Sequence, residues 1–391
     1  MKSEWNHSTI NDVCVLVTDG SHSSPKSVND GKYMVSVKDF TDYGFDFASC
    51  RMISNDDYET LKRNGCVPQI DDILIGKDGA RFFEDIIIYR QREKPALLSS
   101  IAILRCDKSK ILPDFLYYVL RTPSFRQDVK DNYGSGSAIP RIILKDFKRM
   151  MVSYPSLEKQ QAIISVLTAI DSKIQANTEI NDNLADLLQT VYQDRFGNTS
   201  LVTNQGFLSD ICSYSRDKVA VSELNIKTYF STENMLSGKA GSTEATSLPT
   251  TSQTTACHKG DTLISNIRPY FKKIVYCEDK CGCSTDVLCF TPSQPRYSAY
   301  LFSTLYADEF FAFMVAGAKG TKMPRGDKQQ IMTYPVVLPS EEELAGFNTI
   351  ASPLLEQIYS NRAENKRLSI LRDNLLPKLM SGEINVSAVE I

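Results

Sequence analysis

Residues 156–196 read SLEKQQAIISVLTAIDSKIQANTEINDNLADLLQTVYQDRF, and no glycine or proline interrupts them. Apolar side chains recur along this stretch at heptad spacing, which is typical of a long helix that pairs with another helix. We therefore predict one long helix here, about 55 Å in length. Its predicted core positions are Ile163, Val166, Ile170, Asn177, Leu184 and Leu187.

A second helix of the same kind is predicted from Ser340 onwards, because the sequence repeats itself. The repeat begins at GSGSAIPR (134–141) and GAKGTKMPR (317–325), and it continues without a gap through Leu187 and Leu371, which are 184 positions apart. A register kept over such a length indicates duplication. The corresponding core positions of the second helix are Phe347, Ile350, Leu354, Asn361, Leu368 and Leu371.

Two such helices in one chain bury their apolar stripes most simply against each other. We expect an antiparallel pair, since this arrangement relates two duplicated segments by a pseudo-twofold axis. Asn177 and Asn361 then lie near the middle, either as core polar residues that fix the register or as surface residues on a drifting stripe. Pro353 is expected to kink the second helix, because a proline inside a helix costs about 3 kcal/mol.

The segments before each helix have a different pattern. Residues 10–155 and 205–338 alternate short apolar runs, such as DIIIYR (85–90) and TDVLCF (285–290), with turn residues, which is typical of strands. The predicted fold class is α+β, with two mixed α/β domains separated by two long helices that form an antiparallel coiled coil. The expected boundaries are a first domain at 1–155, a long helix at 156–197, a second domain at 198–338, and the second helix with a tail at 339–391.

The net charge of −3 at pH 7 does not by itself indicate a polyanion-binding protein, but the cations are unevenly distributed. Seven Lys and Arg accompany three Asp between Arg121 and Met150, and four accompany one Asp between Lys319 and Lys328. These stretches are either DNA-binding surfaces or ordinary solvated faces. No apolar run reaches the roughly 18 residues of a membrane span, and the N-terminus lacks a signal-peptide pattern, so we expect a soluble cytoplasmic protein.

A search for catalytic and metal-binding motifs finds no convincing centre. The three histidines are scattered along the chain, and no Pro-Pro occurs, so the Asn/Asp-Pro-Pro-aromatic signature of amino-methyltransferases is absent. Cys277, Cys281, Cys283 and Cys289 are dense enough to raise a zinc site as an alternative. However, no Cys-x-x-Cys pair is present, and we favour cysteines that bind no metal.

YPSLEKQQAIISVLTAIDSKIQANTEINDNLADLLQTVYQDRF at 154–196 resembles the central conserved region of the specificity (S) subunits of type I restriction–modification enzymes. LPSEEELAGFNTIASPLLEQIYSNRAENKRLSILRDNLLPKLMSGEINV at 338–386 resembles their C-terminal conserved region. INDVCVLVTDG (10–20) and LSDICSYSRD (208–217) resemble the openings of the family's target recognition domains. The resemblance covers essentially the whole chain and includes the order of its parts.

This resemblance implies that each domain reads one half of a bipartite, asymmetric site in double-stranded DNA, and that the helical spacer sets the number of unread base pairs. It implies docking of two methyltransferase (M) subunits, which carry S-adenosylmethionine, and of restriction (R) subunits, which use ATP and Mg. The chain itself is then non-catalytic and holds no cofactor. Two departures, Pro353 and the lack of a Gln pair in EEELAGF (341–347), weaken the equivalence of the two docking sites.

Candidate DNA contacts are loop residues with cationic or polar side chains, since phosphate contacts position a protein and base contacts specify the sequence. They are Lys77, Arg81, Ser135, Ser137, Arg141 and Lys145 in the first domain, and Asn266, Arg268, Lys272, Lys319, Lys322 and Arg325 in the second. For Arg141 and Arg325, which close the doubled motif, a salt bridge that clamps the domain to its helix is an equal alternative.

A second class of function remains open, in which the chain is a structural adapter that presents two globules to protein partners without binding DNA. The concentration of cations in the globules, and not along the helices, favours the DNA-binding interpretation. A specificity subunit that has lost its partners is a third possibility. A methyltransferase gene beside this one would favour the restriction–modification function.

Overall fold

The computed structural model describes residues 5–79, 81–134, 141–197 and 204–384. The chain divides into two compact units, one formed by Met1–Ile174 with Lys366–Ile391 and the other by Gln175–Asn365. Each unit holds one globule and a part of each of two long helices, α6 (Leu157–Phe196) and α11 (Glu341–Met380).

The globule of the first unit combines short strands with short helices. Its strands are β1 (Asn6–Thr9), β2 (Cys14–Asp19), β3 (Lys32–Val35), β4 (Arg51–Ile53), β5 (Ile73–Gly76), β6 (Ile86–Ile88), β7 (Ala96–Leu97), β8 (Ile101–Cys106) and β9 (Met151–Tyr154). Its helices are α1 (Ile10–Val13), α2 (Asn55–Arg63), α3 (Pro113–Arg121), α4 (Pro123–Asn132) and α5 (Leu144–Arg149), with a 3-10 turn, η1, at Val37–Asp39.

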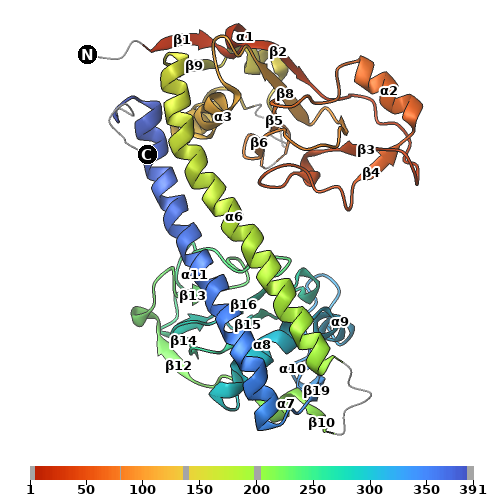
Figure 1. The fold of residues 1–391 in the computed structure, drawn as a ribbon, viewed down its shortest axis with the longest axis vertical. Helices are drawn as coiled ribbons and strands as arrows, with labels where there is room; N and C mark the ends of the chain where they lie inside the picture. Colours follow the sequence, from red (N-terminus) through yellow and green to blue (C-terminus); the bar gives the residue numbers. More distant parts are fainter. Residues whose placement is uncertain (1–4, 80, 135–140, 198–203, 385–391) are drawn as a thin grey trace. The chain divides into compact units, whose positions relative to one another are not determined.

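A four-stranded antiparallel sheet in the order β2-β8-β5-β6 forms the centre of this globule (Figure 1). Ile73, Leu74 and Ile75 of β5 are all fully buried, because β5 lies between two strands and both faces of the sheet are covered. Helix α3 starts with Pro113 at its first position, where the missing N–H costs nothing, and it buries Phe115 in the same core.

The globule of the second unit is built from the same kinds of element. Its strands are β10 (Gln205–Phe207), β11 (Cys212–Tyr214), β12 (Lys218–Ala220), β13 (Tyr229–Phe230), β14 (Gln253–Cys257), β15 (Thr262–Ser265), β16 (Ile274–Tyr276), β17 (Cys281–Cys283), β18 (Val287–Pro292) and β19 (Pro335–Val337). Its helices are α7 (Leu208–Ile211), α8 (Ser298–Tyr306), α9 (Asp308–Ala316) and α10 (Lys328–Ile331), with 3-10 turns η3 (Val221–Glu223), η4 (Pro269–Phe271) and η5 (Pro295–Tyr297).

The two globules share the topology of two sheets, although their sequences have diverged and their third sheets differ, β4-β3-β7 in the first and β12-β14-β17-β13 in the second. The central sheet of the second is ordered β11-β18-β15-β16, which matches β2-β8-β5-β6 strand for strand in chain order. The two-stranded sheet β10-β19 matches β1-β9 in the same way. The duplication that the sequence shows plainly only from the doubled motif onwards therefore extends to the central and two-stranded sheets of both globules.

Helices α6 and α11 pair in antiparallel orientation within each unit (Figure 1). In the first unit, Arg372 Nη1 on α11 donates to Asp171 Oδ1 on α6 at 2.9 Å. In the second, Asn361 Nδ2 on α11 donates to Asn181 Oδ1 on α6, also at 2.9 Å. Because residue numbers rise along one helix as they fall along the other, the predicted antiparallel coiled coil is confirmed.

Three predicted core positions of this pair lie at the surface instead. Leu187, Ile350 and Leu371 are 48%, 37% and 47% exposed, whereas the next residues along the chain, Leu188 and Ala351, are buried. Apolar residues occupy both positions of the Leu187-Leu188 step, so the periodicity alone allows two frames. At Leu187 and Ile350, packing against the globule and the partner helix buries the residue that is one position later.

The other predicted core positions lie inside the pair or at its edge. Ile163, Ile170, Asn177, Phe347 and Asn361 are buried, and Val166, Leu184, Leu354 and Leu368 are partly buried.

A layer of buried amides lies in the second unit's part of the pair. Asn177 Nδ2 donates to Glu364 Oε2 at 2.8 Å and to Asn365 Oδ1 at 2.9 Å. Asn361 Nδ2 donates to Asn181 Oδ1 at 2.9 Å. Since a buried amide in an apolar seam is satisfied only in one alignment of the helices, this layer selects the register at some cost in stability.

Local sequence fixes the helix ends. Ser340 and Glu343 form a reciprocal capping box at the start of α11, with the Glu343 carboxylate accepting from Ser340 N at 2.8 Å. Near the start of α6, the buried amide of Gln160 donates to Lys110 O and accepts from Leu112 N, which attaches the globule to the helix. Pro353 lies on the exposed side of α11 and does not end that helix.

Within the described part of the chain, no helix combines the length and the apolar character that a membrane crossing requires.

Candidate nucleic-acid interface

The best-defined candidate site in each globule is the loop of the hairpin at one edge of the central sheet. In the first unit this is the loop 77–85 between β5 and β6, and in the second it is the loop 266–273 between β15 and β16. Both loops lie at the edge hairpin of their sheets, where side chains are free to reach a ligand.

The doubled Pro-Arg motif holds both loops from the same side. Ile142 N donates to Lys77 O at 3.0 Å, and Gly326 N, 184 positions later, donates to Asn266 O at 3.2 Å. Next to these bonds, Arg141 forms an isolated β-bridge with Asp78, and Arg325 forms one with Ile267. The motif is therefore a backbone latch on the candidate loop, and that role accounts for its presence in both halves of the chain.

Each loop uses left-handed backbone at two matching places. Gly79 has φ 98° and Phe83 has φ 60° in the first loop, while Arg268 has φ 50° and Lys272 has φ 49° in the second. Three of these four residues carry side chains that make this conformation unfavourable, and such strain persists only where the surroundings hold it. The loops are thus held in a defined shape.

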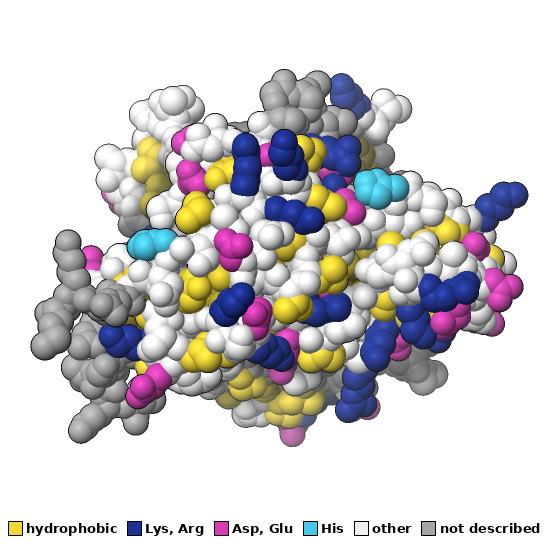
Figure 2. All heavy atoms as spheres, turned by 90° about the horizontal axis from the view of Figure 1, so that it is seen from above, with side chains coloured by type: hydrophobic (Ala, Val, Ile, Leu, Met, Phe, Trp, Pro, Cys, Tyr) yellow, Lys and Arg dark blue, Asp and Glu magenta, His cyan; other side chains and the backbone are white. Residues whose placement is uncertain are grey.

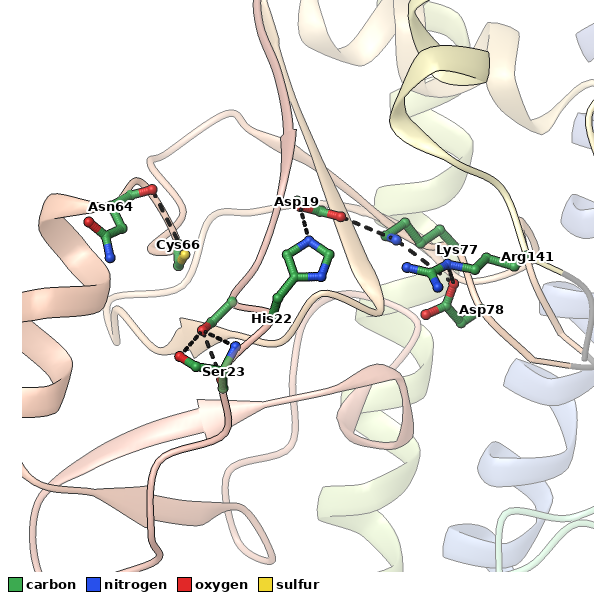
Figure 3. Close-up of polar contacts among 9 residues, drawn as sticks. Asp19, His22, Ser23, Asn64, Cys66, Lys77, Asp78 and Arg141 are labelled. Carbon is green, nitrogen blue, oxygen red and sulfur yellow. Dashed lines mark hydrogen bonds and ion pairs between the residues drawn. The ribbon is translucent and has the colours of Figure 1, made fainter.

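Lys77 and Arg141 serve the first loop itself (Figure 3). Lys77 is only 1% exposed, and its Nζ lies 3.2 Å from Asp19 Oδ2. Arg141 is 47% exposed, and its Nε lies 3.3 Å from Asp78 Oδ1. The buried ammonium of Lys77 is not available to a DNA phosphate in this structure. The ion pair of Arg141 is made to the loop, whereas the sequence suggested one to the helix.

The other candidates of the first domain are more accessible. Arg81 is 72% exposed, and its Nη2 lies 2.7 Å from Asp85 Oδ1, which raises the pKa of the guanidinium. Lys145 is exposed on α5. Ser135 and Ser137 lie outside the described residues. A hollow of about 420 Å³ lies beside the loop and is lined by Lys38, Asp78 and Arg81 among other residues.

In the second domain, Lys322 is the freest of the predicted cations, because it is exposed and has no ion pair among the described residues. Lys319 and Arg325 are also largely exposed, but they pair with Asp327 and Asp286. These three lie on the segment that latches the second loop. They can therefore make phosphate contacts, which position a protein on DNA without reading its sequence.

The remaining predicted residues of the second domain belong to the loop. Asn266 is 6% exposed, and its Oδ1 has no hydrogen-bond partner in the described part of the chain. The Arg268 Nε is also buried and unpaired there. Lys272 Nζ lies 3.0 Å from Asp308 Oδ1, and hydrogen bonds from Lys239 and Lys272 lower the pKa of that carboxyl.

Lys239 is a residue that sequence reasoning missed at this site. Its backbone N donates to Lys272 O at 2.9 Å, and its Nζ lies 2.6 Å from Asp308 Oδ1 and 4.4 Å from the centre of the Tyr306 ring. It lies on a long connection with no apolar periodicity, so nothing in the local sequence pointed to this contact.

Cations and carboxylates are interspersed on the face drawn in Figure 2, where they do not form one continuous basic field. This face therefore lacks the strong overall field that attracts a polyanion without regard to its sequence.

The cysteines belong to the core. Nine of the ten are buried free thiols, and Cys277 Sγ lies 3.6 Å from Cys281 Sγ in an apolar cluster that includes Met235 and Leu263. No group of three or more His, Cys, Asp or Glu in the described part of the chain is arranged to hold a metal ion.

The chain is similar to DNA-specificity proteins of type I restriction–modification systems. Residues 2–185 match the family described as the type I restriction modification DNA specificity domain. The type I restriction enzyme MjaIX specificity subunit of Methanocaldococcus jannaschii is 23% identical over 312 residues, which cover 71% of this chain and 71% of that protein. The HindI specificity subunit of Haemophilus influenzae is 29% identical over 98 residues, which cover 24% of this chain and 21% of that protein.

The crystal structure of the type I restriction–modification S subunit from M. genitalium has the same fold, with a TM-score of 0.56 at 17% sequence identity. The match covers 97% of this chain and 96% of that one. Residues 2–185 are therefore similar to the type I restriction modification DNA specificity domain, and the whole chain shares its fold with an S subunit.

Proposed function

We propose that this chain is the DNA-recognition subunit of a type I restriction–modification complex, and that it binds a bipartite, asymmetric DNA site with one half read by each globule. The observation that carries this proposal is the matching pair of loops, 77–85 and 266–273, each held by one copy of the doubled motif. Two loops with the same support but different side chains suit two unlike half-sites.

The long helices support docking of methyltransferase subunits. Apolar side chains that the helix pair does not bury remain exposed on both, among them Ile180 and Leu187 on α6 and Ile370 and Leu371 on α11. Exposed apolar side chains grouped on helices are typical of protein–protein contacts. Two methyltransferase subunits, one for each copy of the helix, follow from the duplication.

The catalytic steps belong to the partners in this proposal. S-adenosylmethionine is bound by the methyltransferase subunits, and ATP and Mg by the restriction subunits, which join the full complex. The chain contributes recognition, and its own buried ion pairs, such as Lys77 with Asp19, maintain the shape of a loop.

The test is single-molecule methylation sequencing of DNA from cells that co-express this chain with the methyltransferase encoded beside it. We expect modified adenines in a split motif with one fixed gap, and we expect them to vanish when this chain is omitted. Lys322→Ala is a useful variant, because loss of one phosphate contact weakens binding to all sequences alike. The slope of log affinity against log salt concentration should become shallower by about 0.9.

Co-purification of the two proteins without any new methylated motif would contradict the proposal. In that case the adapter function, in which the globules bind proteins, would be favoured.

A further inference from the structure

The tip of the loop 266–273 carries two exposed aromatic rings. Tyr270 is 49% exposed and Phe271 is 38% exposed, and their ring centroids are 4.7 Å apart at an interplanar angle of 58°. Both lie in the 3-10 turn η4, which is only three residues long. Single exposed apolar side chains are common, but two adjacent rings at the tip of a strained turn call for a reason.

The backbone of this turn is held from two sides. Gly238 N donates to Phe271 O at 2.8 Å, and Lys239 N donates to Lys272 O at 2.9 Å. From the segment of the doubled motif, Pro324 O accepts from Arg268 N at 2.8 Å. Three hydrogen bonds from two distant segments maintain the left-handed conformations of Arg268 and Lys272 on either side of the turn. The rings are therefore presented on a rigid support.

The cations next to the rings are already engaged within the protein. Lys272 pairs with Asp308 at 3.0 Å, and Lys273 Nζ donates to Thr232 O at 2.6 Å. Burial also lowers the pKa of Lys273. These two ammonium groups thus stabilise the loop, and the two rings are the exposed side chains of its tip.

A second observation, at the start of the same loop, points to a polar ligand. The Asn266 side chain is only 6% exposed, yet its Oδ1 has no hydrogen-bond partner among the residues that the structure describes. A buried acceptor without a partner costs roughly 1–3 kcal/mol, so an incoming donor is favoured there. An apolar tip and an unsatisfied acceptor in the same loop suit a flat heterocycle that has both faces and donor groups.

We propose that Tyr270 and Phe271 form a base-contacting tip, which reads one or two bases of the half-site assigned to the second globule through apolar ring-to-base contact. Aromatic side chains make such contacts with the methyl group of thymine or with the face of an unstacked base. This inference rests on the proposed function. Among the described residues of the matching loop in the first globule, the exposed one is Arg81, so the two loops read different chemistry.

The experiment selects binding sites from a randomised duplex library, with the chain in complex with its methyltransferase. The variants are Tyr270→Ala and the double variant Tyr270→Ala/Phe271→Ala, with Tyr270→Phe as the matched control that keeps the ring. We expect the alanine variants to lose preference at one or two positions of a single half-site, on the order of 10-fold or more, because base contacts of this kind carry about that much discrimination. The other half-site and the slope of affinity against salt are expected to stay unchanged, because no phosphate contact is lost.

A second set of duplexes, with deoxyuridine in place of thymine, distinguishes contact with the thymine methyl group from stacking on the face of a base. Replacing thymine by deoxyuridine at the affected position removes only the methyl group, so wild-type affinity falls if the rings contact the methyl and stays unchanged if they stack on the base. Either result supports the tip. The affinity of the alanine variants is expected to be the same for the thymine and the deoxyuridine duplexes.

Two outcomes overturn the proposal: alanine variants that keep wild-type preference at every position, and variants whose affinity falls equally for all sequences with the thermal midpoint unchanged. Should the double variant fold poorly, Tyr270→Ala alone decides, because that side chain is half exposed. If the wild-type complex selects no split site at all, it is the proposed function that fails.

Discussion

At the scale of single residues, burial decides what each cation can do. Lys77 and Lys322 are both lysines in loops near the doubled motif, but the first is 1% exposed beside Asp19 and the second is exposed without an ion pair among the described residues. A buried ammonium and carboxylate must stay together, since separating them leaves one charge without compensation in a medium of low polarity.

We therefore expect Lys77→Met to lower the free energy of unfolding by about 3 kcal/mol, because the buried Asp19 then keeps, among the described residues, only its contact with the exposed His22. Lys322→Met is the matched control and should change it by no more than about 0.5 kcal/mol. Urea unfolding followed by circular dichroism measures both. Equal stability of the two variants would show that the Lys77 ammonium reaches solvent in the folded chain.

Cys50 gives a prediction on pH dependence. It is the one cysteine of the ten that is not buried, and partial burial together with the carboxylates of Asp39 and Asp46 raises its pKa to about 12. Since only the thiolate reacts with disulfide reagents, the labelling rate of the native chain should rise about tenfold per pH unit from pH 7 to pH 10. Cys50→Ser should abolish this phase, and a plateau near pH 9 would be inconsistent with the raised pKa.

At the scale of elements, the two halves of the helix pair differ at one equivalent contact. Asp171 pairs with Arg372 at 2.9 Å in the first unit, and Tyr118 Oη also donates to Asp171 at 2.7 Å. At an offset of 184, the corresponding residues of the second unit are Leu355 and Leu188, which belong to one apolar cluster. The duplicated helices have thus replaced an apolar contact by a charged one, or the reverse.

This difference can be tested by transplanting the apolar pair. Asp171→Leu and Arg372→Leu are each expected to destabilise the chain by about 3 kcal/mol, because within the described ranges Arg372 then keeps only the exposed Asp373 and Asp171 keeps only the Tyr118 hydroxyl. The double variant should lie within about 1 kcal/mol of the wild type once Tyr118→Phe removes the hydroxyl that lost its acceptor. Thermal unfolding of the wild type, the two single variants and the double variant with and without Tyr118→Phe completes the cycle, and additive losses would mean that the two charges do not interact.

At the scale of the whole molecule, the helix pair determines the separation of the half-sites in the proposed function. Residues 172–178 of α6 and 364–370 of α11 are opposite one another in the antiparallel register, and Asn177 and its partners Glu364 and Asn365 all lie within them. Removing both segments deletes one heptad from each helix without leaving a buried amide of this set unpaired.

We expect this paired deletion to shorten the unread gap of the methylated motif by about three base pairs, because seven residues span about 10 Å and each base pair about 3.4 Å. Methylation sequencing reads the gap directly. Deleting 172–178 alone is the control, and it should abolish methylation, since the seam of the pair is then broken. A full-length gap after the paired deletion would disprove the helices' role as spacer.

The sequence by itself determined the duplication, the two long helices and the family, because these depend on periodicity and local similarity that a chain keeps in any environment. It also pointed to the loops that follow DDILIG and DTLIS. It did not choose between Leu187 and Leu188 in the seam, because both are apolar and only contact with the partner helix separates the two frames.

Only the tertiary structure decided what the doubled motif and its neighbours do. The bonds from Ile142 to Lys77 and from Gly326 to Asn266 join segments that are far apart in the chain, and no local pattern encodes such a contact. Burial likewise turned Lys77 from a DNA-contact candidate into the partner of Asp19, and left Tyr270 and Phe271 exposed. Exposure is a property of the whole fold, because it depends on everything that packs around a side chain and not on the side chain itself.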